Sequence, residues 1–522
     1  MQRSNLKPRV FAPWFGVAMV AALLFAASCG GSTSTSSGTT PHQGGSLVIA
    51  RTEATATLDP TATFDNESIW VLEQIYNSLY TVNKAGTGVI PSLATSYTLS
   101  QNQLTWTFTL RSGVKFSNGH TMTSADVKFS LDRARKSTEG LGYLDAAISS
   151  IDAPNPSTVV IHTSDPWAPL LADISLFTNS IIPANFGGET EQRFFQSPVG
   201  TGPFKLSSWQ PGGSLTVVRN PYYWQPGLPY LNKVTWTVVP DANTRVLQLE
   251  GNQAQIDEFP PYQSVATLAQ TAGVTAEAFP STEIYFLIMN EKEAPFNDIH
   301  VRQAISYAVD RQALVNSVLF GHGATSNSLF PPTLAFYDPD AQVPQYDLAK
   351  AKQEMAQSSV PNGFSATFLT STDPTFTTIA QVVQQDLAAI GIHLTITTVD
   401  PTTIWTMQGD FQYQMSMGLW TMDIPDPDEL VEFFYNSNGG SSCDYTNYQN
   451  TQMNSMVTDA ASVFGAAQRQ KLYSAIQVQG AQDLPNVPLL HAALAYGFST
   501  KVHGFFVYPL GNYHLENVWL SN

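Results

Sequence analysis

The residue types that do most protein chemistry are present in this chain, but none stands at a spacing typical of an enzyme. The nine histidines are scattered, and there are two cysteines, Cys29 and Cys443. The chain contains no Gly-x-Ser-x-Gly, no His-Glu-x-x-His and no phosphate-binding glycine loop, the patterns that position a nucleophile, a zinc ion or a nucleotide. We therefore expect no catalytic residue, no metal and no cofactor, and we expect that the protein is not an enzyme.

Cys29 follows a segment with the features of an export signal. A few cations precede a mostly apolar run that ends in Ala-Ala-Ser-Cys, and a signal peptidase accepts small residues of this kind. The segment resembles a bacterial lipobox, which implies that residues 1–28 are removed as a lipoprotein signal peptide and that Cys29 carries lipid. An ordinary signal peptide and a membrane anchor are the alternatives. Residues 29–45 are rich in Gly, Ser and Thr, which predicts a flexible tether, and Cys443 is interpreted as a small buried apolar residue.

The acids that follow Trp420 form the other informative group. Asp426 stands directly before Pro427. Because proline favours the first position of a helix, Asp426 is the better cap of the helix that follows. This assignment leaves Asp423 free to bind a ligand.

The elements that must position these residues indicate a mixed α/β chain. Leu104–Arg111 alternates apolar side chains with threonine, the pattern of a strand with one buried face. Further strands are expected at 46–51, 158–162, 214–219, 234–239, 283–289, 365–370 and 393–399. Helices are expected at 67–79, 124–135, 243–251, 298–319, 347–356, 375–390, 427–435 and 466–480. Composition does not change sharply after residue 45, which favours one multi-lobed unit over independent domains.

Composition and charge exclude several classes of protein. Charged residues are 12% of the chain, and 24 Lys and Arg stand against 41 Asp and Glu, for a formal net charge of −17. Nucleic-acid phosphates and anionic lipid both attract clustered cations, so we expect neither nucleic-acid binding nor membrane docking through a basic patch. Two cysteines are too few for a disulfide framework or a multi-cysteine zinc site.

A series of short phrases in a fixed order carries a family resemblance. The longest is Trp106–Leu131, WTFTLRSGVKFSNGHTMTSADVKFSL. The others include LDP at 58–60, IYNSL at 75–79, PSLA at 91–94, PVGTGPFKL at 198–206, NPYYW at 220–224, VRQAISYAVDR at 301–311, QVVQQDLAAIGI at 381–392 and WTMDIPDP at 420–427. Together they resemble the extracytoplasmic solute-binding proteins of the peptide, nickel and oligopeptide family (family 5) of bacterial ABC importers.

The resemblance implies an α/β fold of the two-lobed, periplasmic-binding-protein-like type II, with an inserted extra subdomain and a hinge of two chain crossings. Lobe one would comprise residues 46–280 and 491–522, with the subdomain at 66–196. Lobe two would comprise residues 281–490. Solute would bind between the lobes, which close on it.

The resemblance also implies which residues contact the solute. In peptide-binding members, the aspartate of the phrase around Trp420 pairs with the α-ammonium, and that position is Asp423 here. Other expected contacts are strand-like pairing with the backbone of Gly418, Leu419 and Thr421, stacking on Trp420, and contacts from Phe64, Asp65, Asn66 and Tyr143. Dipeptide-binding members hold the solute carboxylate with an arginine of lobe two, but no arginine lies between Arg311 and Arg469, which favours longer peptides.

The sequence thus predicts a lipid-anchored, monomeric receptor on the outer face of the cell membrane. It would bind a small solute, first of all an oligopeptide, and deliver it to an ABC permease and ATPase complex. An oligosaccharide or a metal chelate as the solute, and a sensing lipoprotein without a transport role, are alternatives. A secreted hydrolase on the same scaffold would need a nucleophile and base pair that the sequence does not show.

Overall fold

The computed structural model describes residues 40–439 and 443–521. The predicted signal peptide, Cys29 and most of the predicted tether lie outside the described residues. Within the described part, no helix is both long and apolar enough to cross a lipid bilayer. The described residues from 41 onward group into one unit.

One large mixed sheet organises the described residues. Its 11 strands follow the order β15-β14-β16-β12-β17-β11-β1-β10-β9-β8, and β13 pairs with β17. The strands are β1 (Ser46–Arg51), β8 (Phe204–Gln210), β9 (Ser214–Arg219), β10 (Lys233–Val238), β11 (Ile256–Glu258), β12 (Val274–Met289), β13 (Gly323–Thr325), β14 (Phe364–Ser371), β15 (Ile392–Val399), β16 (Met415–Trp420) and β17 (Asn486–Ser499). Apolar side chains on its faces belong to separate hydrophobic clusters around β1 and β8–β10 and around β14–β16.

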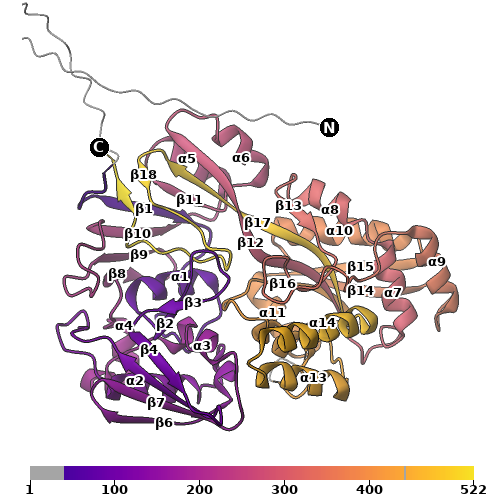
Figure 1. Ribbon diagram of the computed structural model, residues 1–522. Helices are drawn as coiled ribbons and strands as arrows, with labels where there is room; N and C mark the ends of the chain where they lie inside the picture. Colours follow the sequence, from indigo (N-terminus) through magenta and orange to yellow (C-terminus); the bar gives the residue numbers. More distant parts are fainter. Residues whose placement is uncertain (1–39, 440–442, 522) are drawn as a thin grey trace, which may run out of the picture. The chain divides into compact units, whose positions relative to one another are not determined.

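The long strands β12 and β17 run side by side within this sheet and connect its two parts (Figure 1). They pair antiparallel, but the register shifts between Pro280 and Ile284. Proline has no amide to donate to the ladder, which accounts for an irregularity at this point. Ile284 lies opposite His491, so the predicted lobe boundaries fall inside these two strands. The exact domain limits stay a prediction.

A sheet of four strands contains the first part of the longest sequence phrase. Its order is β4 (Ala94–Leu99), β5 (Thr105–Leu110), β7 (Thr158–Thr163) and β6 (Ile148–Asn155). Trp106 and Phe108 of β5 and Leu131 of α2 (Ser124–Ala134) lie in one buried cluster. The amide of Thr123 donates to the carboxylate of Asp126 at 2.7 Å, and α2 begins at Ser124, the residue at which the helix was predicted to begin. Two pairs of short strands are β2 (Tyr80–Val82) with β3 (Val89–Pro91) and β18 (Val502–His503) with β19 (Trp519–Leu520).

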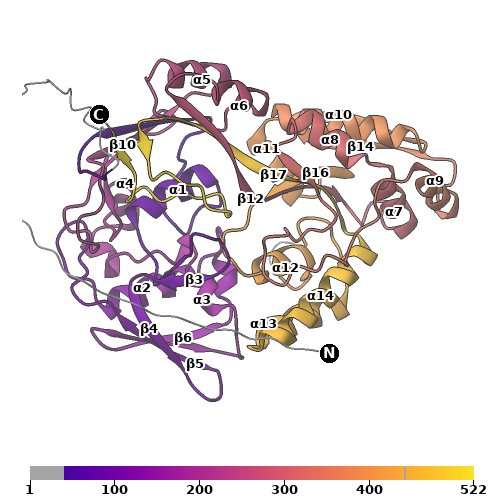
Figure 2. The same cartoon turned by 45° about the horizontal axis from the view of Figure 1, so that its top comes forward.

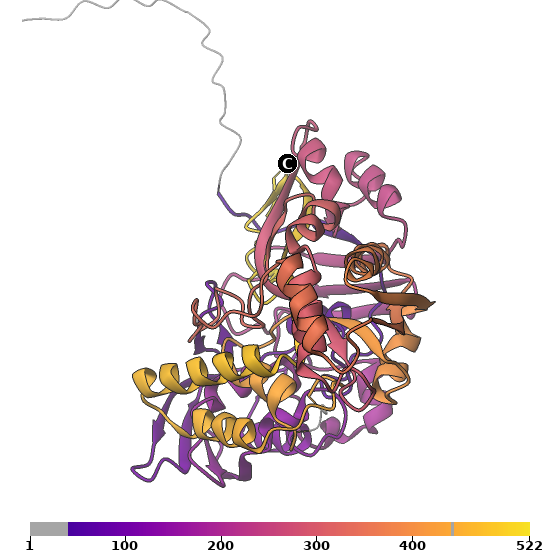
Figure 3. The same cartoon turned by 90° about the vertical axis from the view of Figure 1, so that its right-hand side faces the viewer.

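The remaining helices surround these sheets. They are α1 (Asn66–Ile75), α3 (Leu170–Asp173), α4 (Glu191–Gln196), α5 (Ala242–Glu250), α6 (Tyr262–Leu268), α7 (Ile299–Ala308), α8 (Arg311–Val318), α9 (Leu348–Gln357), α10 (Pro374–Ala388), α11 (Pro401–Gly409), α12 (Asp428–Tyr435), α13 (Thr451–Ser462) and α14 (Ala466–Asp483). Helices α5 and α6 lie at one end of β12 (Figure 2), α5 also contacts β11, and α13 and α14 lie side by side (Figure 3). The prediction of one helix over 298–319 is wrong. Val309 is extended, and the side chain of Asp310 accepts the amide of Ala313, which starts a new helix.

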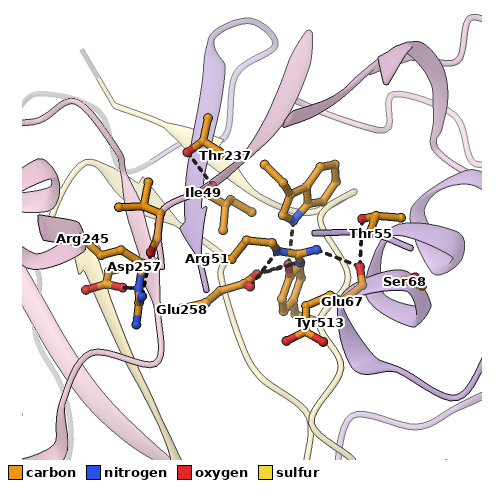
Figure 4. A network of polar contacts seen from close by, with 12 residues as sticks. Ile49, Arg51, Thr55, Glu67, Ser68, Thr237, Arg245, Asp257, Glu258 and Tyr513 are labelled. Atoms are coloured by element: carbon orange, nitrogen blue, oxygen red, sulfur yellow. Dashed lines mark hydrogen bonds and ion pairs between the residues drawn. The ribbon is translucent and has the colours of Figure 1, made fainter. Parts of the chain in front are cut away.

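Arg51, the last residue of β1, lies in a buried polar network (Figure 4). Its Nε and Nη2 donate to both carboxylate oxygens of Glu258 on β11, at 3.0 and 3.2 Å. Its Nη1 donates to the carbonyl oxygen of Glu67 in α1 at 2.7 Å. The hydroxyl of Tyr513 binds both Arg51 and Glu258, and Gln74 of α1 donates to the Tyr513 carbonyl at 2.9 Å. The network therefore joins β1, β11, α1 and the C-terminal segment.

Removing the carboxylate of this network should destabilise the fold strongly. Glu258→Gln leaves the buried guanidinium of Arg51 without its counter-charge, which should lower the free energy of unfolding by about 3–5 kcal/mol. Urea unfolding measures the change. The control is Glu189→Gln, which breaks an ion pair with Arg193 whose side chains are 51% and 75% exposed and should cost less than about 1 kcal/mol. Equal losses in the two variants would contradict the prediction.

Candidate functional site

The loop that follows β16 is folded around one buried carboxylate. Glu429, in the first turn of α12, is fully buried. It accepts the indole N–H of Trp420 at 3.1 Å and the amides of Asp423 and Ile424 at 3.0 and 2.9 Å. Burial and the nearby charge of Asp423 raise the pKa of Glu429 well above its usual range, although the three donors oppose the shift. These contacts fix the backbone around Asp423.

Asp426 ties the same loop to α14. Its two carboxylate oxygens accept hydrogen bonds from the guanidinium of Arg469 at 2.8 and 2.9 Å. Its Oδ1 also accepts the amide of Asp428 at 3.0 Å, so it does satisfy one amide at the start of α12. The ion pair between Asp426 and Arg469 was not predicted from the sequence. Asp423 takes part in neither contact. The predicted cap differs from the structure, in which Pro427 is the N-cap residue of α12 and makes no side-chain cap hydrogen bond, and Asp428 is the first residue of the helix.

The carboxylate of Asp423 accepts no hydrogen bond from the residues that the structure describes, whereas its amide is bound by Glu429. Burial and the negative charge of Glu73, on α1, raise the pKa of Asp423 to about 8. A carboxylate that is partly buried and lacks hydrogen-bond donors binds a cation favourably, because the cation stabilises the negative charge in place of the water molecules that burial removed. Asp423 therefore has the properties of a site for a positively charged group.

Two buried hydroxyls belong to the same region. Tyr143 lies in the 3₁₀ helix η1 (Gly142–Asp145), and within the described ranges neither its hydroxyl nor Oγ1 of Thr421 has a hydrogen-bond partner. Burial and the negative charges of Glu429 and Asp423 raise the pKa of Tyr143 well above its usual range. Buried polar atoms usually have partners, so these hydroxyls mark a polar surface beside Asp423.

The other predicted residues of β16 are held by the protein itself. Trp420 stacks on Phe433 with ring centroids 4.0 Å apart, so one face of the indole is covered. Gly418 is required by packing, because a Cβ there would lie 2.7 Å from the ring of Phe286. Leu419 packs against apolar residues of the same sheet. Pairing of a solute with this backbone stays a prediction.

Phe64, Asp65 and Asn66 lie where α1 begins. Phe64 is 64% exposed, Asp65 caps the helix by accepting the amide of Ser68 at 2.8 Å, and Asn66 is its first residue. In the described part of the chain, no hydrogen bond, ion pair or ring contact links these three residues to Asp423. Their role as ligand contacts stays a prediction.

Cys443 and the metal-binding residue types supply no reactive centre within the described residues. Cys443 is fully buried, and burial raises the pKa of its thiol to about 12, which keeps the thiol protonated and unreactive. In residues 40–439 and 443–521, no three His, Cys, Asp or Glu side chains group as metal ligands.

Sequence reasoning missed Glu429 and Glu73. Glu429 stands in the first turn of a predicted helix, where an acid is favoured by the helix dipole. Because that explains the acid, nothing in the sequence assigns Glu429 a further role. Glu73 gave a clearer signal, since it stands between the buried residues Leu72 and Gln74 on a largely buried helix. An acid at such a position is a candidate for function because burying it is costly.

Comparison with known proteins gives consistent matches. The model of the bacterial extracellular solute-binding proteins, family 5 (middle region), matches residues 88–442. The chain is also similar to the probable D,D-dipeptide-binding periplasmic protein DdpA of Escherichia coli (strain K12). The two are 30% identical over 489 residues, which cover 91% of this chain and 93% of that protein.

Two solved structures share the fold. DppA from Helicobacter pylori in complex with peptide STSA has a TM-score of 0.83 and 27% identity, covering 92% of this chain and 99% of that chain. The oligopeptide-binding protein AppA from Bacillus subtilis in complex with a nonapeptide has a TM-score of 0.82 and 25% identity, covering 92% of this chain and 100% of that chain. The predicted two-lobed α/β fold is thus confirmed.

Buried carboxylic acids should make the stability of the chain depend on pH. Burial raises the pKa of Asp145 to about 7 and that of Asp423 to about 8. An acid whose pKa is raised by folding stabilises the fold fully below its unfolded pKa of about 4, and this contribution falls as the pH rises until it is gone above the folded pKa. We therefore expect the Tm to fall between about pH 6.5 and about pH 8.5. The pKa of the buried His491 is lowered to about 4, so His491 makes stability rise with pH up to its unfolded pKa of about 6.5 and has little effect over most of this interval.

Calorimetry at the two pH values measures this fall. Asp145→Asn should reduce it, because the amide keeps a hydrogen-bond acceptor for Asn179 but cannot ionise. The exposed Asp340→Asn is the control. A Tm that rises with pH over this interval would contradict the assignment.

Proposed function

Since the chain belongs to family 5 of the bacterial extracellular solute-binding proteins, we propose that its solute is an oligopeptide, which it captures between its two lobes and delivers to an ABC permease and ATPase complex. Membership of the family makes the protein a solute-binding receptor. The class of solute, the lipid anchor and the delivery step are the proposal.

The observation that carries the peptide proposal is the carboxylate of Asp423. A peptide ammonium about 4 Å from it, at an effective dielectric constant of about 20, is attracted by about 4 kcal/mol before desolvation. The hydroxyls of Tyr143 and Thr421 are buried without partners in the described residues and offer further hydrogen-bonding groups to the polar atoms of a peptide backbone. Because Glu429 holds the amide of Asp423, the backbone that carries this carboxylate is fixed before the solute arrives.

The two arginines that border the arginine-free part of lobe two are both used by the protein. Arg311 is fully buried and donates to the carbonyls of Pro488 and Ser306 at 2.7 and 2.9 Å. Arg469 binds Asp426. Neither guanidinium is therefore free to bind a solute carboxylate. This supports peptides longer than dipeptides as solutes, because the carboxylate of a longer peptide lies far from the amine site and needs no anchor there.

The peptides bound in two related structures support this size range. DppA from Helicobacter pylori was solved with the peptide STSA, and AppA from Bacillus subtilis with a nonapeptide. We propose a similar class of solute for this chain.

The anchor of the proposed receptor is lipid on Cys29. The end of the predicted tether is bound to the body of the protein, because the amide of Gly44 donates to the carbonyl of Tyr230 at 2.8 Å and the rings of His42 and Trp519 lie 5.3 Å apart. The proposed tether is therefore shortened to residues 29–41, and a flexible chain of that length has a root-mean-square end-to-end distance of about 18–22 Å. A monomer on such a tether stays near the membrane and its permease while it remains free to rotate.

Binding of peptides should stabilise the protein. At about 100 times the Kd, a ligand that binds only the folded state adds about 2.7 kcal/mol to the free energy of unfolding. Thermal unfolding with synthetic peptides of two to nine residues measures the shift, and peptides of four or more residues should give the larger shifts. Stabilisation by oligosaccharides or nickel chelates, with none by any peptide, would contradict the peptide proposal.

The ammonium assignment can be tested at Asp423. Asp423→Asn should weaken binding of peptides with a free amino terminus by about 2–5 kcal/mol, since it removes one partner of a desolvated charge pair. Binding of the N-acetylated peptides should change little. Titration calorimetry compares the two forms, with the exposed Asp410→Asn as the control. An equal loss for both forms of peptide would remove the assignment.

A further inference from the structure

A turn of the C-terminal segment lies against the loop that carries Asp423. The amide of Tyr508 donates to the carbonyl of Asn512 at 2.8 Å and closes this turn. The amide of Thr282 donates to the carbonyl of Pro509 in the turn at 2.8 Å, and Oγ1 of Thr282 accepts the amide of Met422 at 3.1 Å. Thr282 thus connects the turn to the residue directly before Asp423.

Packing places the same turn beside Thr421. A Cβ on Gly511 would lie 3.3 Å from Cγ2 of Thr421. Thr421, two residues before Asp423 on the lobe-two side, therefore lies against Gly511, which directly precedes Asn512 in the C-terminal part of lobe one.

Asn512 holds a second carboxylate in this region. Its Nδ2 donates to both carboxylate oxygens of Glu73 at 2.9 and 3.0 Å. Asn512 is only 7% exposed, and its Oδ1 is a buried acceptor without a donor in the described residues. Burial raises the pKa of Glu73, while His514 opposes this shift and Glu516 adds to it.

Glu73 and Asp423 carry like charges on opposite sides of the site. Each is half-buried, and its pKa is raised by partial burial; the charge of Glu73 adds to the shift at Asp423. Like charges in such a position repel one another unless a proton or a cation lies between them. Asp423, Glu73 and the free Oδ1 of Asn512 together supply acceptors for the three N–H groups of a primary ammonium.

We propose that Glu73 and Asn512 form the lobe-one half of the amine site, so that a primary ammonium of the solute is bound by carboxylates from both lobes at once. This inference rests on the proposed function, in which Asp423 binds the solute amine. It makes Glu73 a specificity-determining residue, and it links the charge of the solute to closure of the lobes, because the cation offsets the repulsion between the two carboxylates.

Native mass spectrometry with a defined peptide pool tests the inference. The probe is an equimolar pool of synthetic tetrapeptides, half with a free amino terminus and half N-acetylated, and the bound masses are read for each variant. The wild-type chain should retain the free-amine members. Glu73→Gln should reduce their retention at least tenfold without changing that of the acetylated members, whereas Glu73→Asp, which keeps the charge, should preserve the preference.

Matched variants separate the possible outcomes. Glu250→Gln removes one exposed charge from α5 and should behave like wild type. If Glu73→Gln matches Glu250→Gln while Asp423→Asn loses the free-amine peptides, the inference is overturned and the proposed function stands. If Glu73→Gln and Glu73→Asp lose both kinds of peptide equally, Glu73 is structural and the inference is overturned. If the wild-type chain retains no peptide, both the inference and the proposed function are overturned.

Discussion

The buried ion pair between Arg51 and Glu258 holds together the part of the structure from which the site is built. It joins β1 to β11 and, through Tyr513, to the C-terminal segment. Asn512 is the residue before Tyr513, and Glu73 is the residue before Gln74, which binds the Tyr513 carbonyl. The same network that stabilises the core therefore sets the distance between Glu73 and Asn512. Burying an ion pair costs free energy unless its hydrogen-bonding groups find partners in the protein. Here the guanidinium is bound by a carboxylate, a carbonyl and a hydroxyl.

The carboxylates of the site show the opposite arrangement. Asp423 and Glu73 have no cationic partner that binds them through a hydrogen bond or an ion pair in the described residues, and Glu429 is satisfied by amides and an indole instead of a cation. Such groups reduce the stability of the folded protein at neutral pH, because burial favours their protonated forms. Groups that oppose folding in this way are common where a ligand later supplies the missing charge.

Much of the scaffold could be predicted from local patterns, whereas half of the site could not. Trp106 and Phe108 alternate with threonine, which is enough to predict a buried strand face. The break at Val309 was missed, because periodic apolar residues continue through it and only the cap at Asp310 marks the new helix. Asp423 was proposed as a ligand contact from a phrase and a capping argument that use only neighbouring residues. Glu73 meets Asn512 across 439 positions of sequence, and no local pattern reports such a contact.

The residues that identify the family and those that we propose to select the solute are largely different. Gly200, in one of the shared phrases, is fixed by packing, since a Cβ there would lie 2.1 Å from the carbonyl oxygen of Ile75. Such positions preserve the fold whatever the solute. The proposed amine contacts, in contrast, come from Asp423 in one phrase and from Glu73 and Asn512 outside the phrases. Relatives can therefore keep the scaffold and change the solute by exchanging a few charged residues around one loop and one turn.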